Sequence, residues 1–421
     1  MSSGADTSAA GGAPTASLYV HVPFCVLKCA YCAFHSTTLS QEPGVAEHFA
    51  WAVGEGAAHW AALGVLDDVA SIYVGGGTPT TLGYPLVTLI ESLLGTCKLA
   101  EDAEITVETN PDTTDPALIE RLVESGVNRF SVGIQSFDDD VLRALGRCHS
   151  SVAAHRAVQS LVGSGAEVSL DLMCGVPGQS PESWRRTLER ALECGAGHVS
   201  VYPLSLEEGT PLADSVHSGK VDTPDDDCAA DMMETAAECL GDAGLHRYEV
   251  ASYARSGCES VHNTGYWTGR PYIGIGPSAA SMLPSDTFST AIACEAWSDP
   301  GLAGVGRTID GVPQESVRVR FLRAADTAGF LRHPVGPPEE IEYLTARQAA
   351  AEDAMLGLRL ARGIADELAV AAGAVAALQD LTALGLVERV DGHWRVSAAG
   401  WLLGNEVFEA VWFAGTRRGL A

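Results

Sequence analysis

The feature that most constrains the fold is a repeat of short β-rich runs, each followed by a stretch with a helical pattern. This alternation is typical of βα units, in which each strand returns to a parallel neighbour through a crossover helix. The runs are SLYVHV (17–22), SIYVGG (71–76), EITVET (104–109), RFSVGI (129–134), EVSLDLM (167–173) and HVSVYPL (198–204). Six units predict an α/β fold built as an open or partial (β/α)6 barrel, two units short of a closed barrel.

Two of the intervening segments carry clear helix signals at both ends. In DPALIERLVESG (115–126), Asp115 suits the N-cap, Pro116 the first helical position and Gly126 the position after the last turn. The segment SPESWRRTLERALECG (180–195) repeats the same scheme. We therefore expect a helix in each segment.

Polar or glycine residues follow every one of the six runs. In parallel α/β folds, binding and catalysis gather at the carboxyl ends of the strands. This convergence predicts a functional site at that edge of the sheet. The residues are Cys25, Cys29 and Cys32 after the first run, GGGTPT (75–80) after the second, Glu108 and Asn110 after the third, Gln135 after the fourth, Asp171 and Cys174 at the fifth and Tyr202 at the sixth.

The pattern changes beyond about residue 220. We expect a helix and then one strand, HRYEVASYA, within 225–256, followed by a glycine- and aromatic-rich loop, VHNTGYWTGRPYIGIGPSAAS (261–281). A helical tail ends in LVERVDGHWRV, where Asp391-Gly392 between two β-rich runs predicts a hairpin. The predicted parts are a flexible tail (1–16), a partial barrel (17–224), a region that covers the barrel and carries an HNxxYW loop (225–342), and a winged-helix-like C-terminal domain (343–421).

Charge and composition exclude several functions. The net charge of −28 disfavours nucleic acid and anionic membrane surfaces as partners, and residues 346–400 hold five Arg against seven Asp and Glu. The longest uncharged apolar run, LAVAAGAVAAL (368–378), is too short to span a bilayer. The 11 cysteines are odd in number and scattered, and residues 1–16 lack the pattern of an export signal. We therefore expect a cytoplasmic protein with mostly free thiols.

The stretch CVLKCAYC (25–32) spaces three cysteines as C-x₃-C-x₂-C. Three thiolates are one short of the four that complete a structural zinc site or a ferredoxin-type cluster, and Phe34 stands where a fourth close ligand would be. Three thiolates around an iron–sulfur cluster would leave one iron open to an added ligand. The alternative is three free thiols in a loop.

YVHVPFCVLKCAYC followed by GGGTPT is similar to the radical S-adenosylmethionine (SAM) superfamily, and specifically to its coproporphyrinogen-oxidase-like branch. The resemblance covers nearly the whole chain from residue 17, through ITVETNP, GVNRFSVGIQSFDDDVLRALGR, SLDLMCGVPGQ, HVSVYPLSLEEGT and HNTGYW. In that superfamily the open iron of a 4Fe-4S cluster binds SAM, and one electron cleaves SAM to a 5′-deoxyadenosyl radical. The resemblance implies both cofactors here, with Cys25, Cys29 and Cys32 as the cluster ligands.

The same resemblance implies a set of SAM-binding residues. Glu108 and Asp171 would accept from an amino group or a ribose hydroxyl, Arg147 would face a carboxylate, and Tyr31 would line the adenine. The glycines of GGGTPT would let the backbone approach the amino group of SAM. The structural alternatives are strand-end capping for Glu108, Gln135 and Asp171, a surface ion pair for Arg147, and a plain tight turn for the glycines. The full set is Tyr19, Tyr31, Gly77, Thr78, Glu108, Gln135, Arg147 and Asp171.

Two features point to a subgroup of the branch. The oxidases typically carry a further cysteine at the position that Phe34 occupies, and an aromatic residue there together with HNTGYW (262–267) resembles the HemW heme chaperones. This implies heme binding by His262, Asn263, Tyr266 and Trp267, with His262 as an axial ligand and the aromatic rings against the macrocycle. The alternative is a packed corner of the fold. Ala33, in place of a common acidic residue, and YEVASYA, which lacks the usual asparagine, depart from the subgroup's pattern.

The resemblance implies a heme chaperone that binds heme and a SAM-liganded 4Fe-4S cluster and transfers heme to apo-hemoproteins, respiratory enzymes among them. We expect at most a peripheral association with membranes, and a homodimer is compatible with this function. The alternative is a radical SAM enzyme that decarboxylates a porphyrinogen or transfers a methyl group. Whether the chaperone turns SAM over is left open by the sequence.

Overall fold

A mixed sheet of twelve strands runs through the part of the chain that the structure describes, which is residues 16–39, 43–222, 226–293, 297 and 311–416 of a computed structural model. The order of neighbours across the sheet is β14–β13–β12–β11–β1–β4–β5–β6–β7–β8–β10–β9. Of the predicted tail (1–16), only Ala16 is described, as the first residue of β1.

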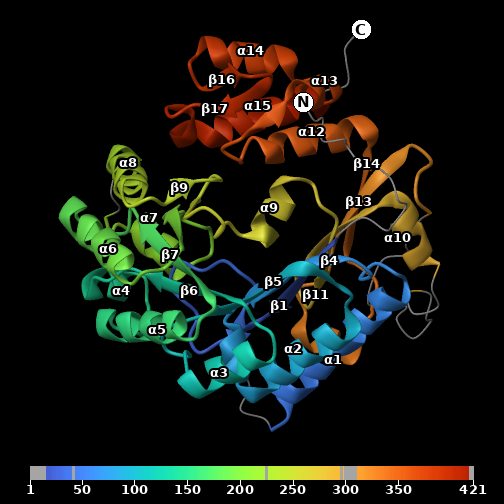
Figure 1. Cartoon of the computed structure of the whole chain (residues 1–421), viewed down its shortest axis with the longest axis horizontal. Coiled ribbons are helices and arrows are strands. Elements are labelled where there is room, and N and C mark those ends of the chain that lie inside the picture. Colours follow the sequence, from blue (N-terminus) through green and yellow to red (C-terminus); the bar gives the residue numbers. More distant parts are fainter. Residues whose placement is uncertain (1–15, 40–42, 223–225, 294–296, 298–310, 417–421) are drawn as a thin grey trace, which may run out of the picture.

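The six predicted runs form six neighbouring parallel strands. They are β1 (Ala16–Val22), β4 (Val69–Gly76), β5 (Leu99–Thr109), β6 (Arg129–Gln135), β7 (Glu167–Cys174) and β8 (His198–Pro203). The crossover helices are α1 (Val45–Ala62), α2 (Tyr84–Thr96), α3 (Pro116–Glu124), α4 (Asp139–Ala144), α5 (Ser151–Gly163) and α6 (Pro181–Glu193), and α7 (Pro211–His217) and α8 (Asp226–Asp242) follow β8. Figure 1 shows helices α1 to α6 along the outside of the curved sheet. The predicted partial (β/α)6 barrel is confirmed.

The predicted ends of α3 and α6 are also confirmed. The Asp115 carboxylate accepts from the Ala117 N–H at 3.1 Å, and the Ser180 hydroxyl accepts from the Ser183 N–H at 3.1 Å. Gly126, after α3, has φ of +113°, a backbone conformation that residues with a Cβ rarely adopt.

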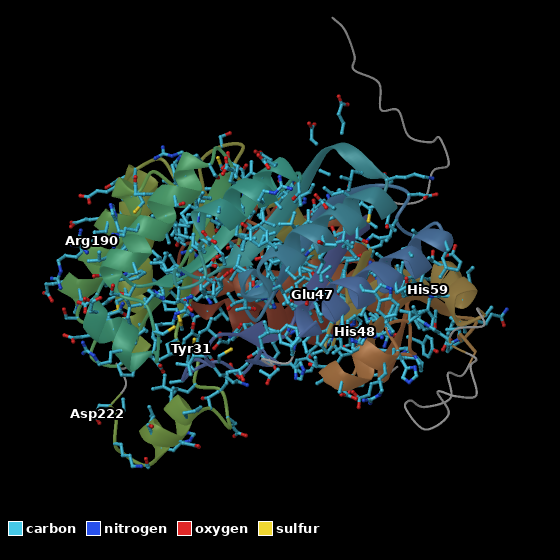
Figure 2. The ribbon with its side chains drawn as sticks, turned by 90° about the horizontal axis from the view of Figure 1, so that it is seen from below. Tyr31, Glu47, His48, His59, Arg190 and Asp222 are labelled. Carbon is cyan, nitrogen blue, oxygen red and sulfur yellow. The ribbon has the colours of Figure 1, made fainter. Side chains whose placement is uncertain are left out.

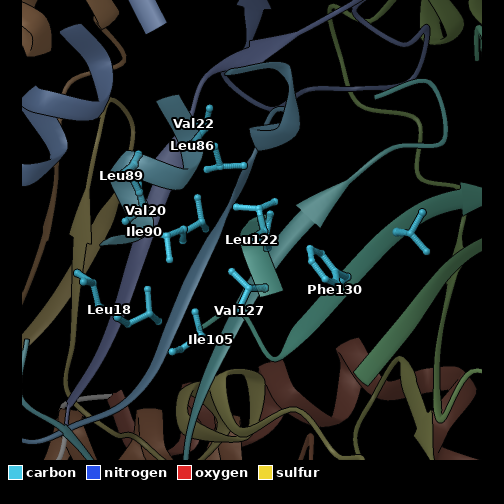
Figure 3. Packing of buried hydrophobic residues seen from close by; sticks show 14 of the residues in the cluster. Leu18, Val20, Val22, Leu86, Leu89, Ile90, Ile105, Leu122, Val127 and Phe130 are labelled. Carbon is cyan, nitrogen blue, oxygen red and sulfur yellow. The ribbon is translucent and has the colours of Figure 1, made fainter. Parts of the chain in front are cut away.

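The two faces of the central strands have opposite character. Leu18, Val20 and Val22 of β1 are fully buried and belong to the main hydrophobic core, which Figure 3 shows from close by. Because side chains alternate along a strand, Ser17, Tyr19 and the other intervening residues point to the concave face. Buried polar residues recur on this face, including Ser71, Thr106, Arg129, Ser169, His198 and Ser200. The concave face is therefore the polar side of the sheet.

Residues after α8 extend this sheet at both edges. At one edge β10 (Ser252–Ala254) pairs antiparallel with β8 and with β9 (His246–Arg247). At the other, β11 (Tyr272–Ile275) pairs parallel with β1, and β12 (Ala280–Pro284), β13 (Ser316–Leu322) and β14 (Glu340–Thr345) follow it antiparallel. Helices α10 (Ser285–Ile292) and α11 (Thr327–Arg332) lie between these strands in the sequence.

Two expectations for this region are wrong. HRYEVASYA is not one strand: β9 and β10 fold back on each other, with Arg247 opposite Tyr253. HNTGYW does not lie in a loop but on helix α9 (Val261–Trp267), which Ser260 caps by accepting from the Asn263 N–H. Helix α9 contacts both β4 and helix α12 (Ala346–Gly357), and Figure 1 shows it between the sheet and the C-terminal elements.

The C-terminal elements have a hydrophobic core of their own, which includes Leu378, Trp394 and Phe408. They comprise α12, β15 (Ile364–Ala365), α13 (Asp366–Ala371), α14 (Val375–Ala383), β16 (Val387–Val390), β17 (His393–Val396) and α15 (Gly404–Thr416). The predicted hairpin is confirmed, since β16 pairs antiparallel with β17 and the turn residues Asp391 and Gly392 have φ of 49° and 76°. This is the expected winged-helix-like arrangement, while the domain boundaries at 224 and 342 stay predictions.

None of the helices within the described ranges combines the length and the apolar character needed to cross a bilayer.

A buried ion-pair network joins α12 to β13. The Glu352 side chain is 2% exposed, and its two carboxylate oxygens lie 2.9 Å from Arg318 Nη1 and 2.7 Å from Arg320 Nη1. Arg318 also forms a bidentate pair with Asp353, at 2.7 and 3.0 Å. This network fixes α12 beside the extended sheet.

Replacing Glu352 by alanine should lower the free energy of unfolding by about 2 kcal/mol, because two partly buried guanidinium groups lose the buried carboxylate that they share and each keeps only one other carboxylate partner. Urea unfolding followed by circular dichroism measures the loss. Glu342→Ala is the matched control: its carboxylate pairs with the same Arg320 but is 55% exposed, so the expected loss is below about 1 kcal/mol. Equal losses in the two variants would contradict the assignment.

Candidate functional site

The three clustered cysteines lie on the loop between β1 and α1. Short strands β2 (Phe24–Cys25) and β3 (Thr37–Thr38) pair at its two ends. Two backbone hydrogen bonds of Ala30 hold its middle, one from the Ala30 N–H to the Leu145 carbonyl and one to the Ala30 carbonyl from the Leu212 N–H. Tyr31, labelled in Figure 2, packs against a small cluster that includes Leu145 and Met173.

Each of the three thiols is half-buried and free of any disulfide. Arg147 Nη1 donates to Cys29 Sγ at 3.3 Å, and the Thr78 hydroxyl lies 3.8 Å from Cys25 Sγ. Burial raises the pKa of Cys25 and of Cys32, and the Cys29 thiol adds to both shifts. A cationic partner, as metal binding supplies, would favour the thiolate form of these two cysteines.

The arrangement fits an iron–sulfur cluster better than a single metal ion. Within the described ranges, no three His, Cys, Asp or Glu side chains converge tightly enough to hold one ion. A 4Fe-4S cluster makes a different demand, because each thiolate binds its own iron atom. Three free thiols on one anchored loop meet that demand and leave one iron for another ligand.

A chain of hydrogen bonds connects two of these thiols through Asn110, at the carboxyl end of β5. The Asn110 amide nitrogen donates to the Thr78 hydroxyl at 2.7 Å, and its amide oxygen accepts from Arg147 Nη2 at 2.6 Å. The relay runs from Cys25 through Thr78, Asn110 and Arg147 to Cys29. The sequence marked Asn110 as a strand-end residue without giving it a role, so the site prediction missed it.

Arg147 does not form the surface ion pair that was its structural alternative. Its guanidinium bonds Cys29, Asn110 and the Gly133 carbonyl, the last at 2.7 Å, and no carboxylate of the described residues lies within 4.0 Å of it. It is half-buried at the cysteine loop. Its position beside the thiols is the one that a ligand of the open iron would approach.

Glu108 stands on the concave face and is held from two sides. Its carboxylate accepts from the Tyr73 hydroxyl at 2.7 Å and from the Gly76 N–H at 3.0 Å. Gly75 must lack a side chain here, because a Cβ would lie 2.8 Å from the Glu108 carboxyl group. Burial raises the pKa of Glu108, and the two hydrogen bonds oppose that shift.

Asp171 occupies the corresponding place on β7. Its carboxylate accepts from the Ser131 hydroxyl at 3.0 Å. Burial raises its pKa to about 7, with a further contribution from the charge of Glu108. Two carboxyl groups that influence each other on a buried face resist ionising together, so a cationic ligand between them would be favoured.

Strand-end capping does not explain Glu108, Gln135 or Asp171. The helices that follow their strands are capped by other side chains, namely Asp115, Asp138 and Ser180. Gln135 instead has φ of 65° and is buried, and the Ser136 N–H donates to the Ile134 carbonyl across it. This tight γ-turn is strained for a residue with a side chain, and such strain gathers at functional sites.

Gly77 is required by the packing of the chain itself. A Cβ at this position would lie 2.5 Å from the Phe24 carbonyl oxygen, where β4 ends against β2. The next residue, Thr78, is buried and donates its N–H to the same oxygen. Close approach of the Gly77 backbone to SAM stays a prediction beside this structural reason.

The proposed heme residues lie beneath this edge, on α9. His262 is 1% exposed, and its ring stacks on Tyr73 with centroids 4.9 Å apart, while Tyr266 meets it edge-on at 4.8 Å. Trp267 lies under the Arg359 guanidinium, 5.3 Å from the ring centroid. Asn263 is half-buried. Among the SAM candidates, Tyr19 reaches this group, with its ring centroid 6.3 Å from that of His262.

The hydrogen bonds of His262 define its tautomer. Ser71 donates its hydroxyl proton to Ser17, so Ser71 Oγ accepts from His262 Nδ1 at 2.9 Å. The other ring nitrogen, Nε2, then carries a lone pair, and it is buried without a partner. Burial, with the charge of Arg270, lowers the pKa of His262 to about 3, so the ring is neutral.

Comparison with known proteins identifies the family. Residues 19–191 match the model of the radical SAM superfamily, and residues 344–403 match that of the HemN C-terminal domain. The heme chaperone HemW of Bacillus subtilis is 30% identical over 404 residues, which cover 94% of this chain and 98% of that protein. The chain belongs to the HemW family of the radical SAM superfamily.

Other relatives match over a shorter span. HemW of Mycobacterium tuberculosis is 40% identical over 270 residues, covering 63% of this chain and 69% of that protein. The mitochondrial radical SAM domain-containing protein 1 of Danio rerio is 38% identical over 267 residues, and the match spans only 60% of its length. Coproporphyrinogen III oxidase of Escherichia coli shares the fold, with a TM-score of 0.73 at 20% identity over 95% of this chain and 90% of the oxidase.

Membership of the HemW family implies a 4Fe-4S cluster and SAM as cofactors. The structure brings most of the predicted SAM residues to the carboxyl edge of the sheet beside the cysteine loop. Asn110 lies with them, and Tyr73 bonds Glu108 from the middle of β4. Phe34, which set the HemW family apart from the oxidases in the sequence, is 69% exposed and outside the core.

The relay should make Asn110 necessary for a stable cluster. Asn110→Ala removes two hydrogen bonds, one of them charge-assisted, and the loss of about 1.5 kcal/mol corresponds to roughly tenfold faster cluster decay in air. Iron and sulfide content after anaerobic reconstitution, and the decay of visible absorbance in air, measure this. Asn128→Ala is the matched control, because Asn128 bonds the backbone of Ile105 and Ala103 at the opposite edge of the sheet. Equal decay rates for both variants would rule the relay out.

The raised pKa of Asp171 predicts a pH-dependent stability. The folded chain keeps a proton on Asp171 up to a pKa of about 7, whereas the unfolded chain releases it near pH 4. Stability therefore falls as pH rises through this window, by up to about 1.4 kcal/mol per pH unit from this group. In urea unfolding at about pH 5, 6 and 7, the stability of Asp171→Asn relative to wild type should increase as pH rises. A difference between Asp171→Asn and wild type that does not change with pH would refute the prediction.

Proposed function

We propose that the protein binds heme and transfers it to apo-hemoproteins, with a SAM-liganded 4Fe-4S cluster in the neighbouring site. The observation that carries the proposal is the position of HNTGYW: helix α9 places an unprotonated imidazole nitrogen of His262 on the same concave face as the SAM candidates. The HemW proteins of three of the matched bacteria carry the name heme chaperone, which supports the same function.

Cys25, Cys29 and Cys32 would hold the cluster. When bound, the cluster supplies one electron to SAM, which is the chemistry of the superfamily. Arg147 would face the carboxylate of SAM, and its bond to the Cys29 thiol supports this role. Glu108 and Asp171 would accept from the amino group and a ribose hydroxyl, with Tyr19, Tyr31, Gly77, Thr78 and Gln135 completing the site.

His262 would supply the axial ligand through Nε2, since a neutral imidazole binds iron through its free lone pair. The nitrogen is buried, so heme reaches it only when α9 moves away from the sheet. Helix α9 has seven residues, and its opening would break the contacts that it makes with β4 and with α12. Tyr266 and Trp267 on the same helix would then pack against the macrocycle, with Asn263 at its edge.

The proposed clients are apo-hemoproteins, with respiratory enzymes among them. A net charge of −28 opposes binding to nucleic acid and to anionic lipid, so any contact with a membrane would be peripheral. We propose a cytoplasmic location, which the free thiols of the described cysteines support.

Hemin titration of the anaerobically reconstituted protein tests the heme role. Wild type should shift the Soret band of hemin, and His262→Ala should weaken binding by about tenfold or more, which corresponds to losing an iron ligand worth at least about 1.4 kcal/mol. His198→Ala is the matched control, because His198 is also buried on the concave face, with its Nδ1 2.7 Å from the Ser169 hydroxyl. It should bind hemin as wild type does.

Two results would rule out the heme role of HNTGYW. One is a wild-type protein that leaves the Soret band unchanged, and the other is a His262→Ala variant that binds hemin normally. Incubation with coproporphyrinogen III and dithionite addresses the alternative enzyme. A decarboxylated product would replace the chaperone role by an oxidase activity, whereas SAM cleavage without product would leave the chaperone role in place.

A further inference from the structure

Tyr73, in the middle of β4, touches both proposed ligand sites at once. Its hydroxyl reaches Glu108, which is a SAM candidate, and its ring covers His262, which is the heme candidate. No SAM or heme role was assigned to Tyr73 from the sequence. Among the described side chains, Tyr73 alone both bonds the carboxylate of Glu108 and stacks on the imidazole of His262.

The contact with Glu108 is specific. The Tyr73 hydroxyl donates to Glu108 Oε1 at 2.7 Å, while the Gly76 N–H occupies the other oxygen at 3.0 Å. Burial raises the pKa of Tyr73 well above its ordinary value, so the hydroxyl keeps its proton and acts as the donor. A phenol donates a stronger hydrogen bond to an ionised carboxylate than to a neutral one. The strength of this contact therefore depends on the charge of Glu108.

The contact with His262 is made by the ring. The two rings are stacked at 27° with centroids 4.9 Å apart, and Tyr266 closes the other side of the imidazole. The start of α9 is tied down separately, because the Glu104 carboxylate accepts from the Val261 and His262 N–H groups at 2.9 and 3.1 Å. Glu104 thus fixes the start of α9. The ring of Tyr73 packs against the first turn of α9, on the side that faces the SAM candidates.

We infer that Tyr73 couples the two sites, so that SAM bound at Glu108 holds α9 closed over His262 and disfavours heme binding. Only the part of this inference that concerns heme rests on the proposed function. Glu108 would accept a hydrogen bond from the amino group of SAM, and a donor beside a carboxylate favours its ionised form. The ionised carboxylate holds the Tyr73 hydroxyl more firmly, and the ring then stays against His262.

Coupling of this kind is reciprocal. If SAM lowers the affinity for heme, heme must lower the affinity for SAM by the same factor. A chain loaded with heme would thus release SAM, and rebinding of SAM would favour release of heme. The device gives the SAM site a role in delivery that needs no cleavage of SAM.

Hydrogen–deuterium exchange of the reconstituted full chain tests the coupling without heme. SAM should slow amide exchange in α9 by about fivefold or more in wild type, the lower end of common coupling strengths. Tyr73→Phe keeps the stacked ring and removes the hydroxyl, so the effect of SAM should disappear in this variant. Tyr253→Phe is the matched control: its hydroxyl is also buried in the sheet but bonds Arg247, so the SAM effect should persist.

Hemin titration with and without SAM gives the second arm. SAM should raise the hemin dissociation constant of wild type by about fivefold or more, and not that of Tyr73→Phe. If SAM leaves α9 exchange in wild type unchanged, or slows it equally in Tyr73→Phe, the coupling is overturned whatever hemin does. If α9 responds as expected but wild type binds no hemin, the heme function fails and the coupling of α9 to the SAM site stands.

Discussion

The alternation of side chains along parallel strands is the constraint on which the rest of this molecule depends. Leu18, Val20 and Val22 face the helices and form the core. Because side chains alternate along the strand, Ser17 and Tyr19 face the concave side of the sheet. The same division holds on the neighbouring strands, where Ser71, Tyr73 and Glu108 point to the concave face. A polar face is therefore the necessary counterpart of the hydrophobic core, and both proposed ligand sites lie on that face.

The sequence predicted the barrel well because its signals are local. A β-rich run, or a cap such as Asp115 before Pro116, lies within a few neighbouring residues and needs no distant partner. Helix α9 could not be predicted in this way, since His, Asn, Thr, Gly, Tyr and Trp are not strong helix formers. The helix is held at its start by Glu104, which is 157 residues away from Val261 in the sequence. Tertiary contact here overrides local propensity, and a loop was the natural expectation from the sequence alone.

The site shows the same limit. Position at a strand end was enough to select the cysteines, Glu108 and Asp171 as candidates. Asn110 had the same signal, but its importance comes from standing between Thr78 and Arg147, which belong to other segments of the chain. Tyr73 lies within β4 rather than at its end. From the sequence alone, a tyrosine at such a position is expected to be an ordinary core residue. Its role is defined by Glu108 on one side and by His262, 189 residues further along the chain, on the other.

The relay through Asn110 has a consequence for how the metal centre is assembled. Thr78 and Arg147 contact two of the three thiols by the protein's own hydrogen bonds. Iron delivered to this loop would therefore meet two thiols whose directions are already set, and the entropy of ordering them would have been lost during folding rather than at capture.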